Sequence, residues 1–154
     1  MSRNTVTETD QGWQRIKDEI SAAQGAGVNV GILSDETETY EDGTDMLLVA
    51  AANEFGTADG HIPPRPFIRG SFDQQSRALQ VLSERLWNQV LAGRLTARNA
   101  LGLLGEEHQG QVQDYIVALQ TPPNAPSTIA QKGSSNPLND EGRLRNAIRW
   151  EHDL

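Results

Sequence analysis

The chain has 154 residues, a formal net charge of −8 and no cysteine. This length predicts a single domain, 1–154, since domains usually contain about 100 to 150 residues, and with only 36% hydrophobic residues its core should be modest. The lack of cysteine excludes disulfide bonds and thiolate metal sites. The acidic balance argues against general affinity for the DNA backbone. No stretch approaches the roughly 20 apolar residues of a membrane span, so we expect a soluble protein with no membrane contact.

The N-terminal part of the chain predicts a helix and then a strand. Asp10 is a suitable N-cap for a helix that closes near Gly25, so that residues 1–27 form an N-terminal helical segment. Residues 28–33 (VNVGIL) alternate β-branched and small side chains, which is typical of a strand. Polar loop residues follow, and a second, weaker strand is an alternative for residues 37–40.

Residues 53–69 (NEFGTADGHIPPRPFIR) combine a helix end, a glycine turn and a rigid proline segment. The helix is expected to stop at the glycine, which tolerates the positive φ of a C-cap. The prolines fix φ and keep the chain extended until the next helix begins. Arg65 and Arg69 flank that beginning, and they have three candidate partners: the carboxylate of Glu54, a neighbouring subunit, or a nucleic-acid phosphate.

Two long amphipathic helices are predicted to follow this loop. The first starts at Phe67 and ends near Gly93, with apolar residues three and four positions apart. Thr96 is a suitable N-cap for the second, and glycines within that helix predict a kink or a close helix contact. Pro122 and Pro123 then end it.

The C-terminal segment, 121–154, is expected to form an arm and a final strand. Residues 121–139 are rich in Pro, Ser, Asn and Gly, which predicts a loop or an extended arm outside the core. A tight glycine turn and a short helical turn are predicted after it. Residues 147–152 alternate apolar and polar side chains, like a strand that returns beside 28–33.

These elements predict an α+β fold, in which a small antiparallel or mixed β-sheet packs with long α-helices. Residues 28–120 would contain the sheet and the long-helix core. An extended loop, 54–69, and the C-terminal arm would project from it.

No group of residues has the spacing of a catalytic or metal site. The three histidines, His61, His108 and His152, are scattered and form no zinc-binding pair. His108 follows Glu106 and Glu107 on a predicted helix, but hydrolysis needs a further partner that the sequence does not position. We therefore expect a protein that is not an enzyme and that binds no metal or cofactor.

Two blocks of the sequence carry a resemblance to a known family. The first is A-x-N-E-F-G-T followed by I-P-P-R-P-F-I-R, and the second is 127–148 (STIAQKGSSNPLNDEGRLRNAI). In both, the chain resembles the tail-completion, or neck, proteins of long-tailed bacteriophages, whose C-terminal pattern places S-x-T-I-x-x-K-G before P-L-x-D-x-G-R-L-x-x-S-I. With the helices between them, the blocks bring about two thirds of the chain under the resemblance.

The resemblance implies a structural protein of the virion that joins the tail to the DNA-filled head. Such subunits form a homo-oligomeric ring, commonly a hexamer, between the head-closure or connector protein and the tail terminator or tail tube protein, and DNA passes through the lumen without sequence-specific binding. A ring needs two different faces on each subunit. The residues that we expect at subunit or partner interfaces are Glu54, Phe55, Arg65, Phe67, Arg69, Lys132, Arg143, Arg145 and Trp150.

Other functions remain open at this point. A tail terminator or head-closure protein would form a similar ring in a neighbouring layer. A small phage hydrolase would depend on Glu106, Glu107 and His108, and an acidic inhibitor of a host nucleic-acid-binding protein would depend on the net charge of −8. The acidic run at 35–45 has two interpretations, a solvated loop or the lining of an anionic lumen that repels DNA.

Overall fold

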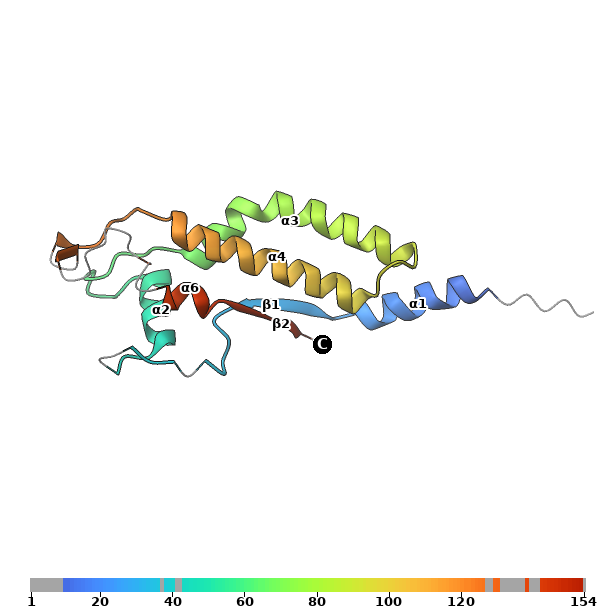
Figure 1. Ribbon diagram of the computed structural model, residues 1–154, viewed down its shortest axis with the longest axis horizontal. Coiled ribbons are helices and arrows are strands. Elements are labelled where there is room, and N and C mark those ends of the chain that lie inside the picture. Colours follow the sequence, from blue (N-terminus) through green and yellow to red (C-terminus); the bar gives the residue numbers. More distant parts are fainter. Residues whose placement is uncertain are drawn as a thin grey trace, which may run out of the picture.

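Two long helices, lying side by side, dominate the computed structural model, which describes residues 10–36, 38–40, 43–126, 129–130, 138 and 142–153. Helices α3 (Phe67–Leu91) and α4 (Ala97–Ala118) form a hairpin, and α4 lies between α3 and a two-stranded sheet (Figure 1). Helix α1 (Gln11–Ala23) lies at one end of this elongated arrangement and α2 (Met46–Phe55) at the other. The predicted α+β class is confirmed.

Polar side chains cap helix α1 and bind it to the long-helix hairpin. The Asp10 carboxylate accepts a hydrogen bond from the Trp13 N–H at 2.9 Å, which confirms the predicted N-cap. Arg15 donates to the carbonyl oxygens of Val90 and Leu91 at 3.4 and 3.5 Å. Four residues further on, Glu19 accepts from the N–H of Ala97 at 2.6 Å. Helix α1 is thereby tied to the turn that joins α3 and α4.

The sheet consists of β1 (Gly27–Gly31) and β2 (Arg149–Asp153), which pair antiparallel with Val30 opposite Trp150. The predicted return of the last strand beside the first is therefore confirmed. The weaker strand at 37–40 is not observed among its described residues, which form only an isolated bridge between Thr39 and Asp45. Thr37 lies outside the described residues.

Contacts between α4 and β2 explain two of the three glycines of the second long helix. The Trp150 ring lies against Gly102 and Gly105, where a Cβ atom would approach it to 3.2 and 2.8 Å. The close contact at these glycines is thus with a strand, whereas a helix contact was expected. Thr96 caps α4 as expected, since its hydroxyl accepts from the Asn99 N–H at 3.2 Å.

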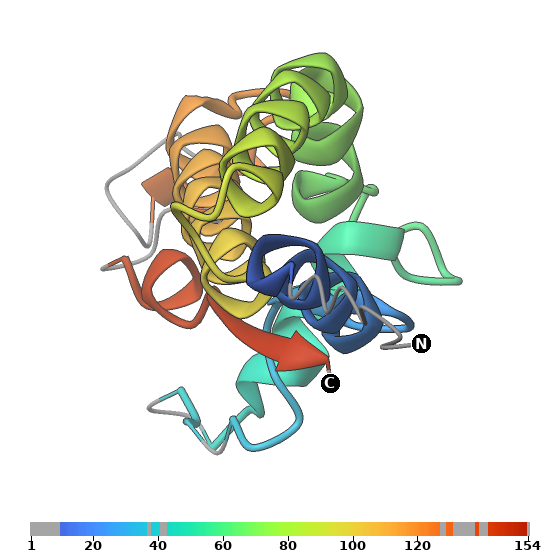
Figure 2. The same ribbon diagram turned by 90° about the vertical axis from the view of Figure 1, so that its right-hand side faces the viewer.

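The main hydrophobic core joins α2, the start of α3, the C-terminal half of α4 and the C-terminal residues. Its buried members are Met46, Ala50, Phe67, Val112, Ile116, Leu138, Leu144, Ala147 and Ile148. A smaller cluster of Leu86, Val90, Ala97 and Ala100 lies at the α1 end. Figure 2, which views the molecule along the hairpin, shows the C-terminal residues beside α4.

One sequence expectation is wrong here. Residues 121–139 were expected outside the core, yet Leu138 is 3% exposed and Asn124 is 9% exposed. Leu138 packs in the main core, where its apolar side chain is removed from water. A composition rich in Pro, Ser, Asn and Gly predicts irregular backbone in this segment. It does not predict which of the few apolar residues of the segment are buried.

No helix in the described part of the chain combines the length and apolar character needed to cross a membrane.

Gly105 is predicted to be required for the contact between α4 and β2. A Cβ atom at Gly105 would lie 2.8 Å from the Trp150 ring, whereas a Cβ at Gly110, on the same helix, would meet nothing within 4 Å. Gly105→Ala should therefore lower the free energy of unfolding by roughly 1–2 kcal/mol, because overpacking outweighs the gain in helix propensity. Gly110→Ala should raise it by up to about 1 kcal/mol. Urea unfolding of both variants measures the difference, and equal effects would contradict the Trp150 contact.

Candidate interaction site at the junction of α2 and α3

The Glu54 carboxylate holds the end of α2 against the beginning of α3. Its side chain is buried, and its two oxygens accept hydrogen bonds from the N–H groups of Ile68 and Arg69 at 3.0 and 3.2 Å. Arg69 adds an ion pair of 2.9 Å from Nε to the same carboxylate, and its Nη2 donates to the Glu54 carbonyl oxygen. Glu54 therefore caps α3, whose N-cap residue, Pro66, provides no side-chain hydrogen bond.

Gly56 makes this arrangement sterically possible. Its φ is +76°, and a Cβ atom there would lie 3.0 Å from Pro64. A residue with a side chain would be strained by this φ and would push the proline segment away. The predicted positive φ at the end of the helix is confirmed, although ψ is 171° and the residue is thus outside the left-handed helical region.

Arg65 ties the loop to the segment after α4. It is 5% exposed, and its guanidinium donates to the carbonyl oxygens of Pro122 and Pro123 at 2.8 and 3.0 Å. It also donates to Oδ1 of Asn53 at 3.1 Å, and its own N–H donates to the Asn53 carbonyl oxygen. Burial lowers the pKa of Arg65 from its usual value. These contacts with carbonyls 57 and 58 residues away have no signal in the sequence.

The predicted interface residues of the loop divide into two groups. Glu54, Arg65 and Phe67 are 5%, 5% and 1% exposed, so their side chains contact other residues of the same subunit. Phe55 is 67% exposed, and the Arg69 guanidinium lies over its ring, 5.0 Å from the centroid. Of the three partners considered for Arg69, the structure shows Glu54. We accordingly narrow the predicted interface in this loop to Phe55 and the exposed part of Arg69.

An apolar cavity opens beside Phe55. It has a volume of about 270 Å³, and it is lined by Ile32, Leu47, Ala51, Phe55 and Ile68, with Glu54 and Arg69 at its edge. The neighbouring Leu48 is 64% exposed. Apolar surface of this kind, next to an ion pair, suits contact with another protein better than it suits catalysis.

The remaining predicted interface residues lie away from this junction. Arg143, at the start of α6 (Arg143–Asn146), places its guanidinium 5.7 Å from the centre of the Tyr40 ring, and Arg145 is exposed. Trp150 packs on α4 through its ring and is half-buried, so it contributes to the sheet face inside the subunit. Lys132 lies outside the described residues. The structure thus does not gather these residues into one site.

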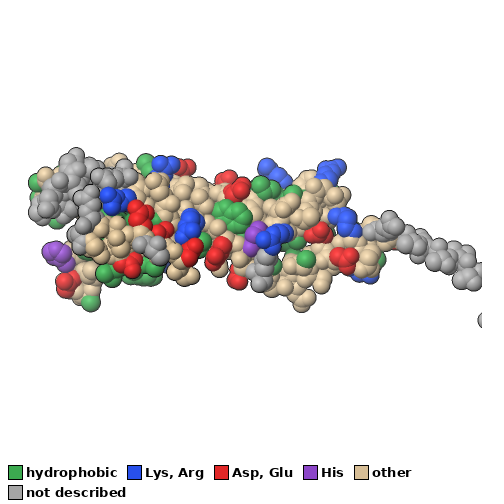
Figure 3. Space-filling view, turned by 60° about the horizontal axis from the view of Figure 1, so that its bottom comes forward, with side chains coloured by type: hydrophobic (Ala, Val, Ile, Leu, Met, Phe, Trp, Pro, Cys, Tyr) green, Lys and Arg blue, Asp and Glu red, His purple; other side chains and the backbone are tan. Residues whose placement is uncertain are grey.

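The acidic run is partly neutralised within the chain. Arg149 pairs with Asp35 at 2.6 Å and with Glu36 at 3.7 Å, and its hydrogen bond lowers the pKa of the Asp35 carboxyl. Glu41 and Asp42 lie outside the described residues. On the face drawn in Figure 3, acidic and basic side chains are interspersed. That face gives no support to an extended acidic surface.

Glu106, Glu107 and His108 do not converge on one point. Glu106 lies beside Trp150 and His152, whereas Glu107 lines the opposite groove, between α3 and α4, and bonds to Gln111 at 2.9 Å. His108 packs beside Phe72, with ring centres 5.8 Å apart, and its Nε2 is buried. Within the described ranges, no three His, Cys, Asp or Glu side chains are close enough to hold a metal ion. This arrangement positions no acid and base around a common substrate.

Protein-family models, curated protein sequences and solved structures were compared with the chain, and none of them matched. The resemblance to phage neck proteins therefore rests on the residues of the two sequence blocks.

Arg65 is predicted to stabilise the monomer. Arg65→Ala would leave the Pro122 and Pro123 carbonyls and the Asn53 side chain without their donor, so the free energy of unfolding should fall by roughly 3 kcal/mol. Arg94→Ala, at an exposed arginine, should change it by less than about 0.5 kcal/mol. Chemical unfolding followed by circular dichroism measures both. A fully stable Arg65→Ala monomer would show that these hydrogen bonds contribute little.

His108 is predicted to make folding sensitive to acid. Burial lowers the pKa of His108, and its Nε2 has no hydrogen-bond partner among the described residues. The unfolded chain therefore binds a proton at pH values where the folded chain does not, and stability should decrease as the pH falls below about 6.5 and on through the folded-state pKa. His108→Gln should lose less stability than the wild type between pH 7 and pH 5. Parallel unfolding curves for the two proteins across this range would contradict the prediction.

Proposed function

We propose that the chain is a structural subunit of the neck of a tailed bacteriophage, a tail-completion protein that forms a ring between the tail and the DNA-filled head. The proposal starts from the two sequence blocks that resemble this family. It includes the head-closure or connector protein and the tail terminator or tail tube protein as its neighbours, and it places the protein in the virion.

The observation that carries the proposal is that described residues of both blocks pack in one core. Phe67, from the first block, belongs to the same buried cluster as Leu138, Leu144 and Ile148 from the second. Arg65, also from the first block, binds the carbonyls of Pro122 and Pro123 just before the second block begins. Motifs that are about 60 residues apart in sequence thus form one structural unit, as expected if they were inherited together.

The chemistry of the described residues also favours a structural role. The ion pair between the buried Glu54 carboxylate and Arg69 and the hydrogen bonds of Arg65 hold the backbone in place, beside an exposed apolar surface that includes Phe55. Functional contacts usually lie on loops held by a rigid scaffold. The junction of α2 and α3 has this construction.

Deletion of the gene from its phage or prophage is expected to block the joining of heads and tails. Electron microscopy of the lysate should show filled heads beside separate, complete tails, and the gene supplied in trans should restore joined particles. A strain complemented with the Arg94→Ala variant, which changes an exposed arginine, should also give joined particles.

Other particle phenotypes would place the protein elsewhere. Tails of irregular length would indicate a tail terminator, and heads that have lost their DNA would indicate a head-closure protein. Normal virions from the deletion strain would overturn the structural proposal altogether.

A further inference from the structure

Helix α2 exposes an apolar ridge, at one end of which the Arg69 guanidinium lies over the Phe55 ring. Leu47, Leu48, Ala51 and Phe55 share this side of the helix, and Leu48 and Phe55 are 64% and 67% exposed. Residues three and four positions apart on a helix form one stripe, so these side chains are continuous. An exposed stripe of large apolar residues is typical of a contact surface.

Two carboxylates flank the N-terminal end of this ridge. Asp45 is the N-cap of α2, and Glu38 lies beside it, since the Glu38 carbonyl oxygen accepts a hydrogen bond from the Met46 N–H at 3.1 Å. Neither carboxylate forms an ion pair within the described residues. The ridge therefore combines an apolar stripe with negative charge at one end.

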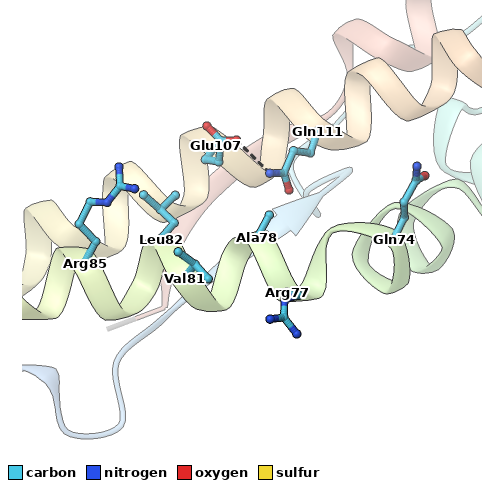
Figure 4. A pocket seen from close by; sticks show the side chains of 8 residues that line it. All are labelled: Gln74, Arg77, Ala78, Val81, Leu82, Arg85, Glu107 and Gln111. Carbon is cyan, nitrogen blue, oxygen red and sulfur yellow. Dashed lines mark hydrogen bonds between the residues drawn. The ribbon is translucent and has the colours of Figure 1, made fainter.

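A groove with the complementary character lies between α3 and α4. Its volume is about 620 Å³, and α3 lines it with Ala78, Val81, Leu82, Arg77 and Arg85. From α4 it is lined by Glu107, whose carboxylate accepts a hydrogen bond from Gln111. Figure 4 shows Ala78 and Leu82 facing α4, with Arg85 reaching toward α4 and Arg77 on the outer side of α3. The two arginines are eight residues apart, or about 12 Å along the helix. Neither is in an ion pair within the described part of the chain.

The ridge and the groove lie on different sides of the subunit. In Figures 1 and 2, α3 forms the upper edge of the molecule, whereas α2 and the segment that leads into it lie below α4. A single chain cannot bring these two surfaces together. Two copies can, in a head-to-tail contact of the kind from which rings are built.

We propose that the α2 ridge of one copy docks in the α3–α4 groove of the next, with Glu38 and Asp45 facing Arg77 and Arg85. This inference rests on the proposed ring and specifies its subunit contact. Apolar side chains fill the floor of the groove, and the opposite charges fix the direction of docking. A second copy suits the groove better than DNA does, because a phosphate backbone would leave Val81, which is 51% exposed, without an apolar partner.

Cysteine cross-linking tests the contact directly, because the chain has no cysteine of its own. The full chain carrying both Leu48→Cys and Val81→Cys is treated with a short bis-maleimide and run on a denaturing gel. Head-to-tail docking predicts a ladder that extends beyond the dimer. An equimolar mixture of the two single variants should give a dimer and nothing larger, because each chain then offers one linkable surface.

Charge reversal provides the matched controls. Arg77→Glu with Arg85→Glu, added to the two-cysteine chain, should reduce the ladder at least tenfold. Further reversal of Glu38 to Lys, which leaves the Asp45 cap of α2 in place, should restore part of it. A control chain carries Gln24→Cys with Val81→Cys, so that one cysteine lies at an exposed position next to α1 and none lies on the ridge. This chain should give no ladder. A ladder from this control pair equal to that from the test pair would overturn the proposal.

Other occupants of the two surfaces give distinct results. Dimers from Leu48→Cys alone would indicate a symmetric contact between ridges and would overturn the proposal. Binding of a fluorescent DNA duplex that is lost on reversal of Arg77 and Arg85 would assign the groove to phosphate instead.

The proposed subunit contact and the proposed neck function can be tested independently of each other. Cross-linking is carried out both on the purified chain and on complemented phage particles. Joined particles that give no link between positions 48 and 81 would leave the neck function in place and overturn the contact. A ladder from a protein whose deletion leaves virions normal would establish the contact and remove the neck function.

Discussion

A single buried carboxylate organises the most distinctive part of this protein. Glu54 lies near the end of one helix and caps the next, so bonds of 2.9 to 3.2 Å close the loop between Glu54 and Arg69, which is fifteen positions further along the chain. Such a carboxylate is stable away from water only if its lone pairs are satisfied, and here two backbone N–H groups and a guanidinium satisfy them. The exposed position of Phe55, and with it the surface that we propose for contact, follows from this arrangement.

The second organising feature is the convergence of distant segments on one core. Met46 and Phe67 meet Leu138, Leu144 and Ile148 there, so the C-terminal residues complete a core that α2, α3 and α4 leave open. The packing of described residues from the two resembling blocks against each other is the observation on which we base the proposed neck function. The buried residues of these blocks stabilise the subunit, and we propose the exposed ridge and groove as the surfaces that contact partners.

Local signals predicted much of the fold, because they depend on a few neighbouring residues. The caps at Asp10 and Thr96, the turn at Gly56 and the pairing of the first and last strands were read correctly. The role of Arg65 was not, since an arginine beside a helix looks the same whether it binds a phosphate or the carbonyls of Pro122 and Pro123. The burial of Leu138 and the stripe of α3 that forms the groove likewise depend on which elements meet, and this information is spread over the whole chain.

Helix α1 has an electrostatic consequence for the hairpin that it touches. The C-terminus of α3 carries partial negative charge and the N-terminus of α4 carries partial positive charge, and the two lie side by side at the turn. Arg15 binds the first and Glu19 the second, so one helical turn of α1 supplies both counter-charges in the required order. Helix α1 therefore matches the polarity of the hairpin turn, and the reverse orientation of α1 would place each charged side chain beside a partial charge of the same sign.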